Sequence, residues 1–90
     1  MTRRKRLRPI KIVWKRLKDV WGYASTDQHL IELDERMGDK LLLEIAAHEV
    51  AHVVAPYLDE EAIDLLGRHI GDVLYRLKFR RADHGEQGDS

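Results

Sequence analysis

Hydrophobic and polar residues alternate along two short stretches in the first half of the chain. Residues 10–15 read IKIVWK and are rich in β-branched and aromatic side chains. Residues 29–34 read HLIELD, in which Ile31 and Leu33 share one face and two acidic residues share the other. The pattern therefore predicts a strand at each of these two positions.

Turn-forming residues dominate the segment between the two predicted strands. Gly22 and residues 24–27 (ASTD) are typical of turns, whereas residues 17–21 fit either a strand or a short helical turn. We therefore expect a short sheet of two or three strands.

The second half of the chain has the periodicity of two helices. Apolar residues cover most of the circumference of residues 40–55, which predicts a buried central helix that Asp39 caps and Pro56 ends. Residues 60–78 have one apolar stripe, and Asp59 is expected to cap this second helix. The stripe consists of Ile63, Leu66, Ile70, Val73, Leu74 and Leu77. Together these patterns predict an α+β fold, with a short sheet packed on a helix that is followed by a second, antiparallel helix.

The length and composition indicate one small domain. Ninety residues bury only about 60–65% of the surface of the unfolded chain, so a bound ion would add usefully to stability. The absence of cysteine excludes disulfides and leaves histidine and carboxylate side chains as the strong metal ligands. We expect a disordered basic arm over residues 1–9, one domain over residues 10–80 and a flexible tail over residues 81–90.

The distribution of apolar residues predicts neither a membrane span nor a signal peptide. No apolar run approaches the roughly 20 residues of a membrane-spanning helix, and the basic start is not followed by an apolar segment. We therefore expect a cytoplasmic protein with no membrane partner.

The net charge is zero, but the start of the chain is strongly basic. The cations there are Arg3, Arg4, Lys5, Arg6 and Arg8. Such an arm is either simply solvated or makes non-specific contact with the phosphate backbone of a nucleic acid, and both interpretations stand. It has no interleaved aromatic residues, so it does not indicate sequence-specific reading of bases.

The candidate chemistry lies in the sequence His48-Glu49-Val50-Ala51-His52, within the first predicted helix. Because residues four apart share a helix face, His48 and His52 can place two imidazole nitrogens on one metal ion. Glu49 is about 100° further round the helix, beside the ion, where its carboxylate can act as the general base for a water molecule. This H-E-x-x-H pattern predicts a zinc-dependent peptidase.

Two histidines four residues apart can also be ordinary helix residues. In a helix as apolar as this one, however, unpaired polar groups are unfavourable, and three of them converge on one side. A metal ion supplies the missing partner, so we favour the metal site.

A catalytic zinc ion needs a third protein ligand. The metzincin extension is absent, because Ala55 and Leu58 stand where its glycine and last histidine would be. The remaining candidates are Glu60 and Glu61 in the first turn of the second helix. Glu60 is the preferred ligand, since helical projection places it about 100° from the centre of the apolar stripe and Glu61 about 160°.

The stretch from residue 31 to residue 79 resembles the small phage and prophage zincins of the ImmA/IrrE-like metallopeptidase group. The matching segments are LIELDERM, LLLEIAAHEVAH and PYLDEEAIDLLGRHIGDVLYRLKFRR. The resemblance implies a strand before the active-site helix, zinc held by His48, His52 and a downstream glutamate, and Glu49 as general base. It also implies that the ligand glutamate opens an E-x-x-x-D pattern, which Glu60 and Asp64 match. SprT-like proteases share this arrangement of zinc ligands and general base.

Two functional hypotheses follow. In the first, the chain is a gluzincin-type zinc metallopeptidase that hydrolyses a protein or peptide, and an extended substrate adds along the edge of the strand near residues 29–34. In the second, it is a non-catalytic, zinc-stabilised binding module, associated with nucleic acid through the basic arm. A weaker third interpretation is a DNA accessory protein without a metal.

Several other polar and aromatic residues are weaker candidates. His29 is at the start of a predicted strand, and His69 lies on the flank of the second helix; solvated or structural roles are expected for both. A tyrosine near the site would be able to stabilise an oxyanion, and the candidates are Tyr23, Tyr57 and Tyr75. Trp14 and Trp21 are expected in the core or at its rim. Asp64 is expected to hydrogen-bond a ligand histidine.

Overall fold

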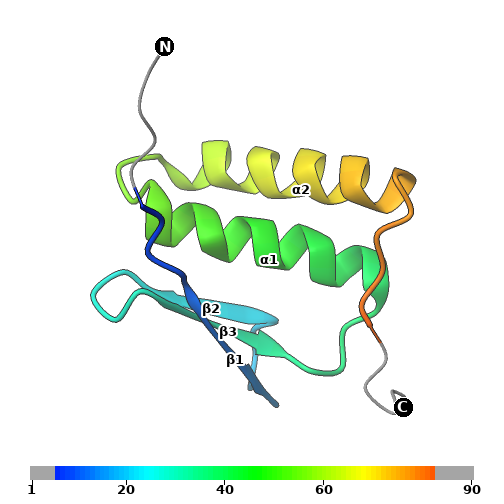
Figure 1. Ribbon diagram of the computed structural model, residues 1–90, viewed down its shortest axis with the longest axis horizontal. Coiled ribbons are helices and arrows are strands. Elements are labelled where there is room, and N and C mark those ends of the chain that lie inside the picture. The colour runs from blue at the N-terminus through cyan, green and yellow to red at the C-terminus, as the bar shows by residue number, and fades with distance from the viewer. Residues whose placement is uncertain (1–5, 83–90) are drawn as a thin grey trace.

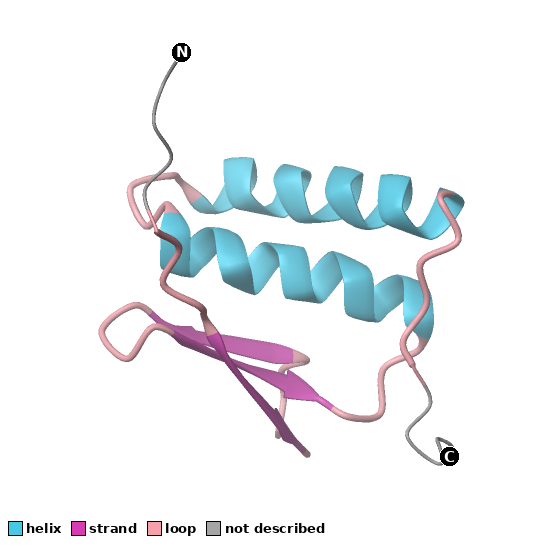
Figure 2. Ribbon diagram, viewed as in Figure 1, coloured by secondary structure: helices cyan, strands magenta, loops and turns pink. Residues whose placement is uncertain are grey.

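The computed structural model describes residues 6–82. Its strands are β1 (Lys11–Lys15), β2 (Gly22–Ser25) and β3 (Leu30–Asp34), and its helices are α1 (Asp39–Val54) and α2 (Glu60–Arg76). The sheet, α1 and α2 form a stack in which α1 is the middle layer and the two helices run antiparallel (Figures 1 and 2). This arrangement confirms the predicted α+β class.

The sheet has the strand order β1-β3-β2. The central strand β3 pairs parallel with β1, where Ile12 is opposite Ile31, and antiparallel with β2, where Tyr23 is opposite Glu32. Because β3 has neighbours on both edges, Ile31 and Leu33 are buried in the core beneath α1.

The structure corrects two predictions about the sheet. Residues 22–25 were assigned to turns, but they form β2, because pairing with β3 along the whole segment outweighs its weak local preference. The edge near residues 29–34 was expected to receive a substrate, but β3 is the central strand and both its edges are occupied. The free edge on this side of the sheet belongs to β2.

The helix ends agree with the sequence pattern to within two residues. Asp59 caps α2, since its Oδ1 atom accepts the Ala62 N–H at 2.8 Å. Asp39 does not cap α1: the cap is Gly38, and Asp39 is the first helical residue. There its negative charge favours the helix N-terminus, and its Oδ1 atom accepts the Arg81 N–H at 3.3 Å.

The face that α2 turns towards α1 differs from the predicted apolar stripe. The buried positions are Ile63, Gly67 and Gly71. A Cβ atom on Gly71 would come within 2.7 Å of the Glu44 Cα and N atoms, so the glycines let the two helix backbones approach closely. As a result, most of the predicted stripe lies beside the helix contact, and Leu66 and Ile70 remain 41% and 42% exposed.

A buried carboxylate fixes the loops at the carboxyl end of β3. Asp34 is fully buried and accepts the Leu17 N–H at 2.9 Å, while Arg36 donates to it from its backbone N, its Nε and its Nη2. These hydrogen bonds hold the pKa of Asp34 well below its usual range, the largest cause being the Arg36 side chain. The network ties the β1–β2 loop to the turn before α1.

The remaining predictions concern the two tryptophans, the basic arm, the tail and membrane-spanning helices. Trp14 and Trp21 are half exposed, as expected for the core rim, and Trp14 stacks under the Arg81 guanidinium at 4.3 Å. Arg3, Arg4 and Lys5 lie outside the described residues, as do residues 83–90 of the predicted tail, whereas Arg6 and Arg8 are exposed. Neither helix within residues 6–82 has the length and apolar character needed to cross a bilayer.

Candidate metal centre

Three side chains from two helices converge at the end of the α1–α2 pair that is nearest the connecting loop. The Nε2 atoms of His48 and His52 lie 3.2 Å apart, and the two rings are tilted by 60°. His48 Nε2 is 3.0 Å from Glu60 Oε2, and His52 Nε2 is 3.2 Å from Glu60 Oε1. The histidines are part-buried, whereas the glutamate is 70% exposed. The structure therefore brings together the predicted histidines and the preferred glutamate.

The spacing of the two histidine nitrogens fits a tetrahedral ion. Two nitrogen ligands about 2.0–2.1 Å from a tetrahedral zinc ion lie roughly 3.3 Å from each other, and the two Nε2 atoms are 3.2 Å apart. Glu60 approaches each histidine with a different oxygen, Oε2 at His48 and Oε1 at His52. Each imidazole presents the same nitrogen, Nε2, to the centre, so His48, His52 and Glu60 form a group that could hold a metal ion.

The close approach of the two helices brings Glu60 within reach of the histidines. Glu60 and Gly67 are seven residues apart, so Glu60 lies only about 20° from the face of α2 that meets α1. At that contact a Cβ atom on Gly67 would be 3.0 Å from His48 Cβ. The helical projection took the centre of the apolar stripe as the face that meets α1, and it therefore placed Glu60 too far from that contact. The contact is in fact centred on Gly67 and Gly71.

Two other predicted site residues are not in the group. Within the described part of the chain, the candidate metal-binding group contains Glu60 and not Glu61, which is about 120° from Gly67 on the helix and exposed. Asp64 was expected to hydrogen-bond a ligand histidine, but its Oδ2 atom accepts from Arg68 Nη1 at 3.5 Å instead.

Glu49 is buried between α1 and β2, next to the candidate metal-binding group. It is 9% exposed, and burial raises its pKa, which the neighbouring histidines lower and Glu60 raises further. A Cβ atom on Gly22 would come within 2.9 Å of Glu49 Cγ, so only glycine leaves room for this side chain beneath the strand. Gly22 is thus a site residue that sequence analysis missed, because a glycine near a serine and an aspartate is typical of a turn.

An open cleft of about 330 Å³ lies between β2 and the end of α1. Its lining consists of Gly22, Tyr23, Ala24, Thr26, Glu49, His52 and Pro56. The Thr26 hydroxyl donates to the His52 carbonyl at 3.4 Å, which ties the β2–β3 turn to the helix that carries the histidines. The cleft therefore joins one candidate metal ligand, His52, and the candidate base to the free edge of β2.

Among the weaker candidates, one tyrosine lies at the cleft, and the other tyrosines and the two histidines lie elsewhere. Of the three tyrosines, Tyr23 lines the cleft, whereas Tyr57 is 84% exposed in the α1–α2 loop and Tyr75 stacks against Arg80 at 3.8 Å. His29 makes a 2.9 Å hydrogen bond with the Arg8 carbonyl, and His69 lines a separate polar groove with Asp72. Neither histidine is in the group that could hold a metal.

No family model matches the chain, and neither the curated proteins nor the solved structures contain a significant match. The geometry of His48, His52, Glu60 and Glu49 therefore carries the functional argument.

Proposed function

We propose that this protein is a zinc-dependent metallopeptidase. The observation that carries the proposal is the convergence of His48, His52 and Glu60, which offer three ligand atoms within 4.8 Å of one another, with a buried glutamate directly beside them. This is the ligand set and general base that peptide hydrolysis needs, and it opens onto a cleft along a free strand edge.

His48, His52 and Glu60 would hold the ion. A bound zinc ion lowers the pKa of a water molecule and polarises a carbonyl oxygen. The Glu49 carboxylate takes a proton from the attacking water as its oxygen bonds to the peptide carbon. Glu49 then delivers that proton to the leaving nitrogen as the C–N bond breaks.

The free edge of β2 is the expected binding surface for an extended substrate. The Asp34 N–H donates to the Trp21 carbonyl, and the register continues with Tyr23 opposite Glu32. In an antiparallel ladder the hydrogen-bonding direction alternates, so the N–H and C=O groups of Gly22 and Ala24 point away from β3. A peptide paired with them runs past Glu49 and His52.

Replacement of Glu49 by glutamine tests the proposal. We expect Glu49→Gln to lower kcat for the cleavage of fluorescein-labelled casein, a generic unfolded substrate, by about 10²–10⁴-fold, because the base is lost. Zinc content, measured by mass spectrometry, should stay unchanged. Glu44→Gln, on the same helix but outside the cleft, is the matched control and should retain full activity. Equal activity in Glu49→Gln and the wild type would exclude this mechanism.

The same experiment separates the alternative function. If the protein is a non-catalytic zinc module, the wild type and Glu49→Gln both bind zinc and neither cleaves casein or a peptide library. The position of Glu49 beside the three candidate ligands and at the wall of the open cleft favours the catalytic proposal, because a purely structural zinc site is closed by its protein ligands and needs no base.

A further inference from the structure

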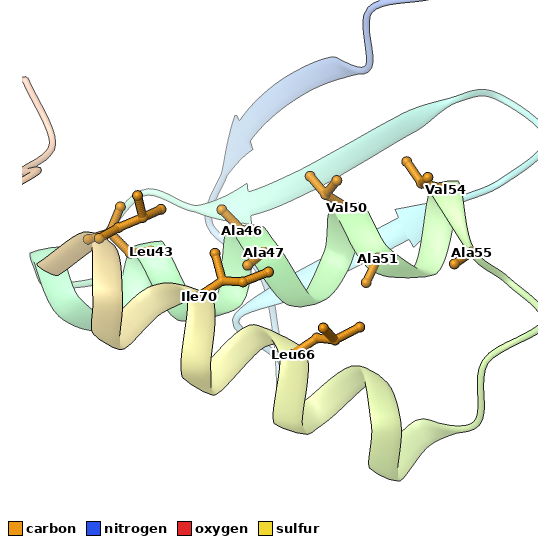
Figure 3. A pocket seen from close by; sticks show the side chains of 10 residues that line it. Leu43, Ala46, Ala47, Val50, Ala51, Val54, Ala55, Leu66 and Ile70 are labelled. Carbon is orange, nitrogen blue, oxygen red and sulfur yellow. The ribbon is translucent and has the colours of Figure 1, made fainter. Parts of the chain in front are cut away.

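One flank of the α1–α2 pair is an uncovered apolar groove of about 450 Å³. Its walls are Leu43, Val50 and Val54 on α1 and Leu66, Ile70 and Leu74 on α2. Figure 3 shows Leu66 and Ile70 directed towards a row of alanines on α1. None of the residues that line the groove is charged.

The close contact between the helices creates this groove. Because α2 meets α1 through Gly67 and Gly71, the apolar stripe of α2 is left beside the contact and forms a ridge along the open flank. The ridge residues are 41–62% exposed, and they are Leu66, Ile70, Val73 and Leu77. A small-residue floor thus lies next to a ridge of large apolar side chains.

The groove is on the opposite side of α1 from the candidate metal centre. Leu43 and His52 are nine residues apart, which places them about 180° apart on the helix. A partner seated in the groove therefore leaves the cleft beside His52 open.

The size of the flank is at the lower end of the range for a stable protein interface. Helices of 16 and 17 residues are about 25 Å long, and two such helices packed together span about 20 Å across. The flank thus covers on the order of 500 Å² in projection. Its accessible area is larger, because protruding side chains make the surface uneven. A standard interface buries about 800 Å² per partner, and an apolar patch of more than a few hundred Å² marks an interaction site.

We propose that a second copy of this chain occupies the groove. In a two-fold arrangement each surface must complement itself, and here the α2 ridge of one copy fits the alanine-floored groove of the other. The zero net charge of the chain imposes no long-range repulsion between copies. The residues of this sequence outside the described range, 1–5 and 83–90, are mostly charged or polar and lack an apolar segment that would fill the groove.

Two neighbouring leucines provide a matched test. Leu66 is 41% exposed and lines the groove, whereas Leu65 is 45% exposed on the polar flank beside His69 and Asp72. At about 100 µM, a hundredfold above a micromolar dissociation constant, light scattering should give the wild type and Leu65→Glu twice the 10.5 kDa chain mass. Leu66→Glu should give the mass of one chain, with an unchanged circular dichroism spectrum. A monomeric wild type, or equal masses for the two variants, overturns the proposal.

A crosslink keeps the test valid if Leu66→Glu fails to fold. The chain has no cysteine, so a single introduced thiol can pair only with its own copy. Ile70 is central in the ridge and lies near the expected two-fold axis, so Ile70→Cys should form a disulfide-linked dimer under mild oxidation. Leu65→Cys should stay largely unlinked. Equal crosslinking of both variants, or none in Ile70→Cys, contradicts an interface on this flank.

Discussion

At the scale of single residues, two buried carboxylates have opposite electrostatic environments. Glu49 is buried near His48, His52 and Glu60, and burial raises its pKa. Asp34 is buried more completely, but four hydrogen bonds stabilise its charge, and its pKa falls well below the usual range. The pKa of a buried carboxylate therefore depends on the number of donors that hydrogen-bond to it and not on burial alone. This number distinguishes the candidate base Glu49 from the structural acid Asp34.

Asp34 should make the protein sensitive to acid. Its pKa is lower in the folded than in the unfolded chain, so its contribution to stability is complete above the unfolded value of about 3.9 and is lost as pH falls below it. We expect Asp34→Asn to be much less stable than the wild type at pH 7, and the difference to shrink between about pH 4 and pH 2. Urea unfolding across this pH range measures the difference.

The neighbouring acid is the control for this prediction. Glu35 is exposed and pairs only loosely with Arg16, at 3.4 Å, so Glu35→Gln should change stability little at any pH. A constant difference between Asp34→Asn and the wild type from pH 7 to pH 2 would show that the charge of Asp34 does not matter.

At the scale of elements, the glycines of α2 set its distance from α1. A Cβ atom on Gly71 would meet the Glu44 backbone at 2.7 Å, and backbone atoms cannot move aside as a flexible side chain can. Overpacking costs about 1–3 kcal/mol, and the better helix propensity of alanine offsets about 1 kcal/mol. We expect Gly71→Ala to lower the free energy of unfolding of the zinc-free protein by up to about 2 kcal/mol, as measured by urea titration.

Gly38 provides the comparison, because no atom lies within 4 Å of a Cβ placed there. Alanine is a poorer helix cap than glycine, but it also reduces the conformational freedom of the unfolded chain, so Gly38→Ala should change the free energy of unfolding by no more than about 0.5 kcal/mol. If both variants have the same stability, the close approach of the helices is not what Gly71 provides.

The short edge strand β2 should act on substrate through its backbone. The Ala24 N–H points away from β3, so Ala24→Pro removes a donor to the substrate without breaking the sheet ladder. We expect kcat/KM on labelled casein to fall by roughly 3- to 10-fold, the effect of one backbone hydrogen bond, with zinc content unchanged. Ala24→Gly, which retains the N–H, should keep most of the activity; a loss equal to that of Ala24→Pro would contradict strand addition.

At the scale of the whole molecule, the middle layer α1 explains the arrangement of surfaces. The sheet covers one side of α1 and α2 covers another, which leaves two open flanks (Figure 1). One flank is polar and contains the candidate metal centre and cleft, and the other is the apolar groove. The proposed catalytic and self-association surfaces are thus separated by the width of one helix.

The sequence predicted the parts of this molecule that depend on local pattern. Both helices, β1 and β3 follow from periodicity, and the spacing of His48 and His52 follows from helix geometry. β2 was missed because only its pairing with β3 makes it a strand. The exposed stripe of α2 was also misplaced, because the sequence pattern favours the largest apolar side chains as the contact, whereas Gly67 and Gly71 pack closest.

The choice between adjacent acids limited the prediction of the metal centre. Their place in the first turn of the second helix made Glu60 and Glu61 the candidates for the third ligand, and helical projection favoured Glu60. The group in the structure that could hold a metal contains Glu60, as the rotation of α2 about its axis determines. That rotation is set by Gly67 and Gly71, whose G-x-x-x-G spacing is visible in the sequence and is the signal that would have identified the contact face.

The most direct test of the account is zinc affinity in Glu60→Gln and Glu61→Gln, measured by competition with a chelator of known affinity. The two acids are adjacent and receive the same substitution, but only Glu60 lies 3.0–3.2 Å from the histidine nitrogens. We expect the wild type and Glu61→Gln to bind one zinc ion per chain with equal affinity, and Glu60→Gln to bind it at least about 10-fold more weakly. Equal affinity in Glu60→Gln and the wild type, or no zinc bound by the wild type, would contradict the proposed metal centre.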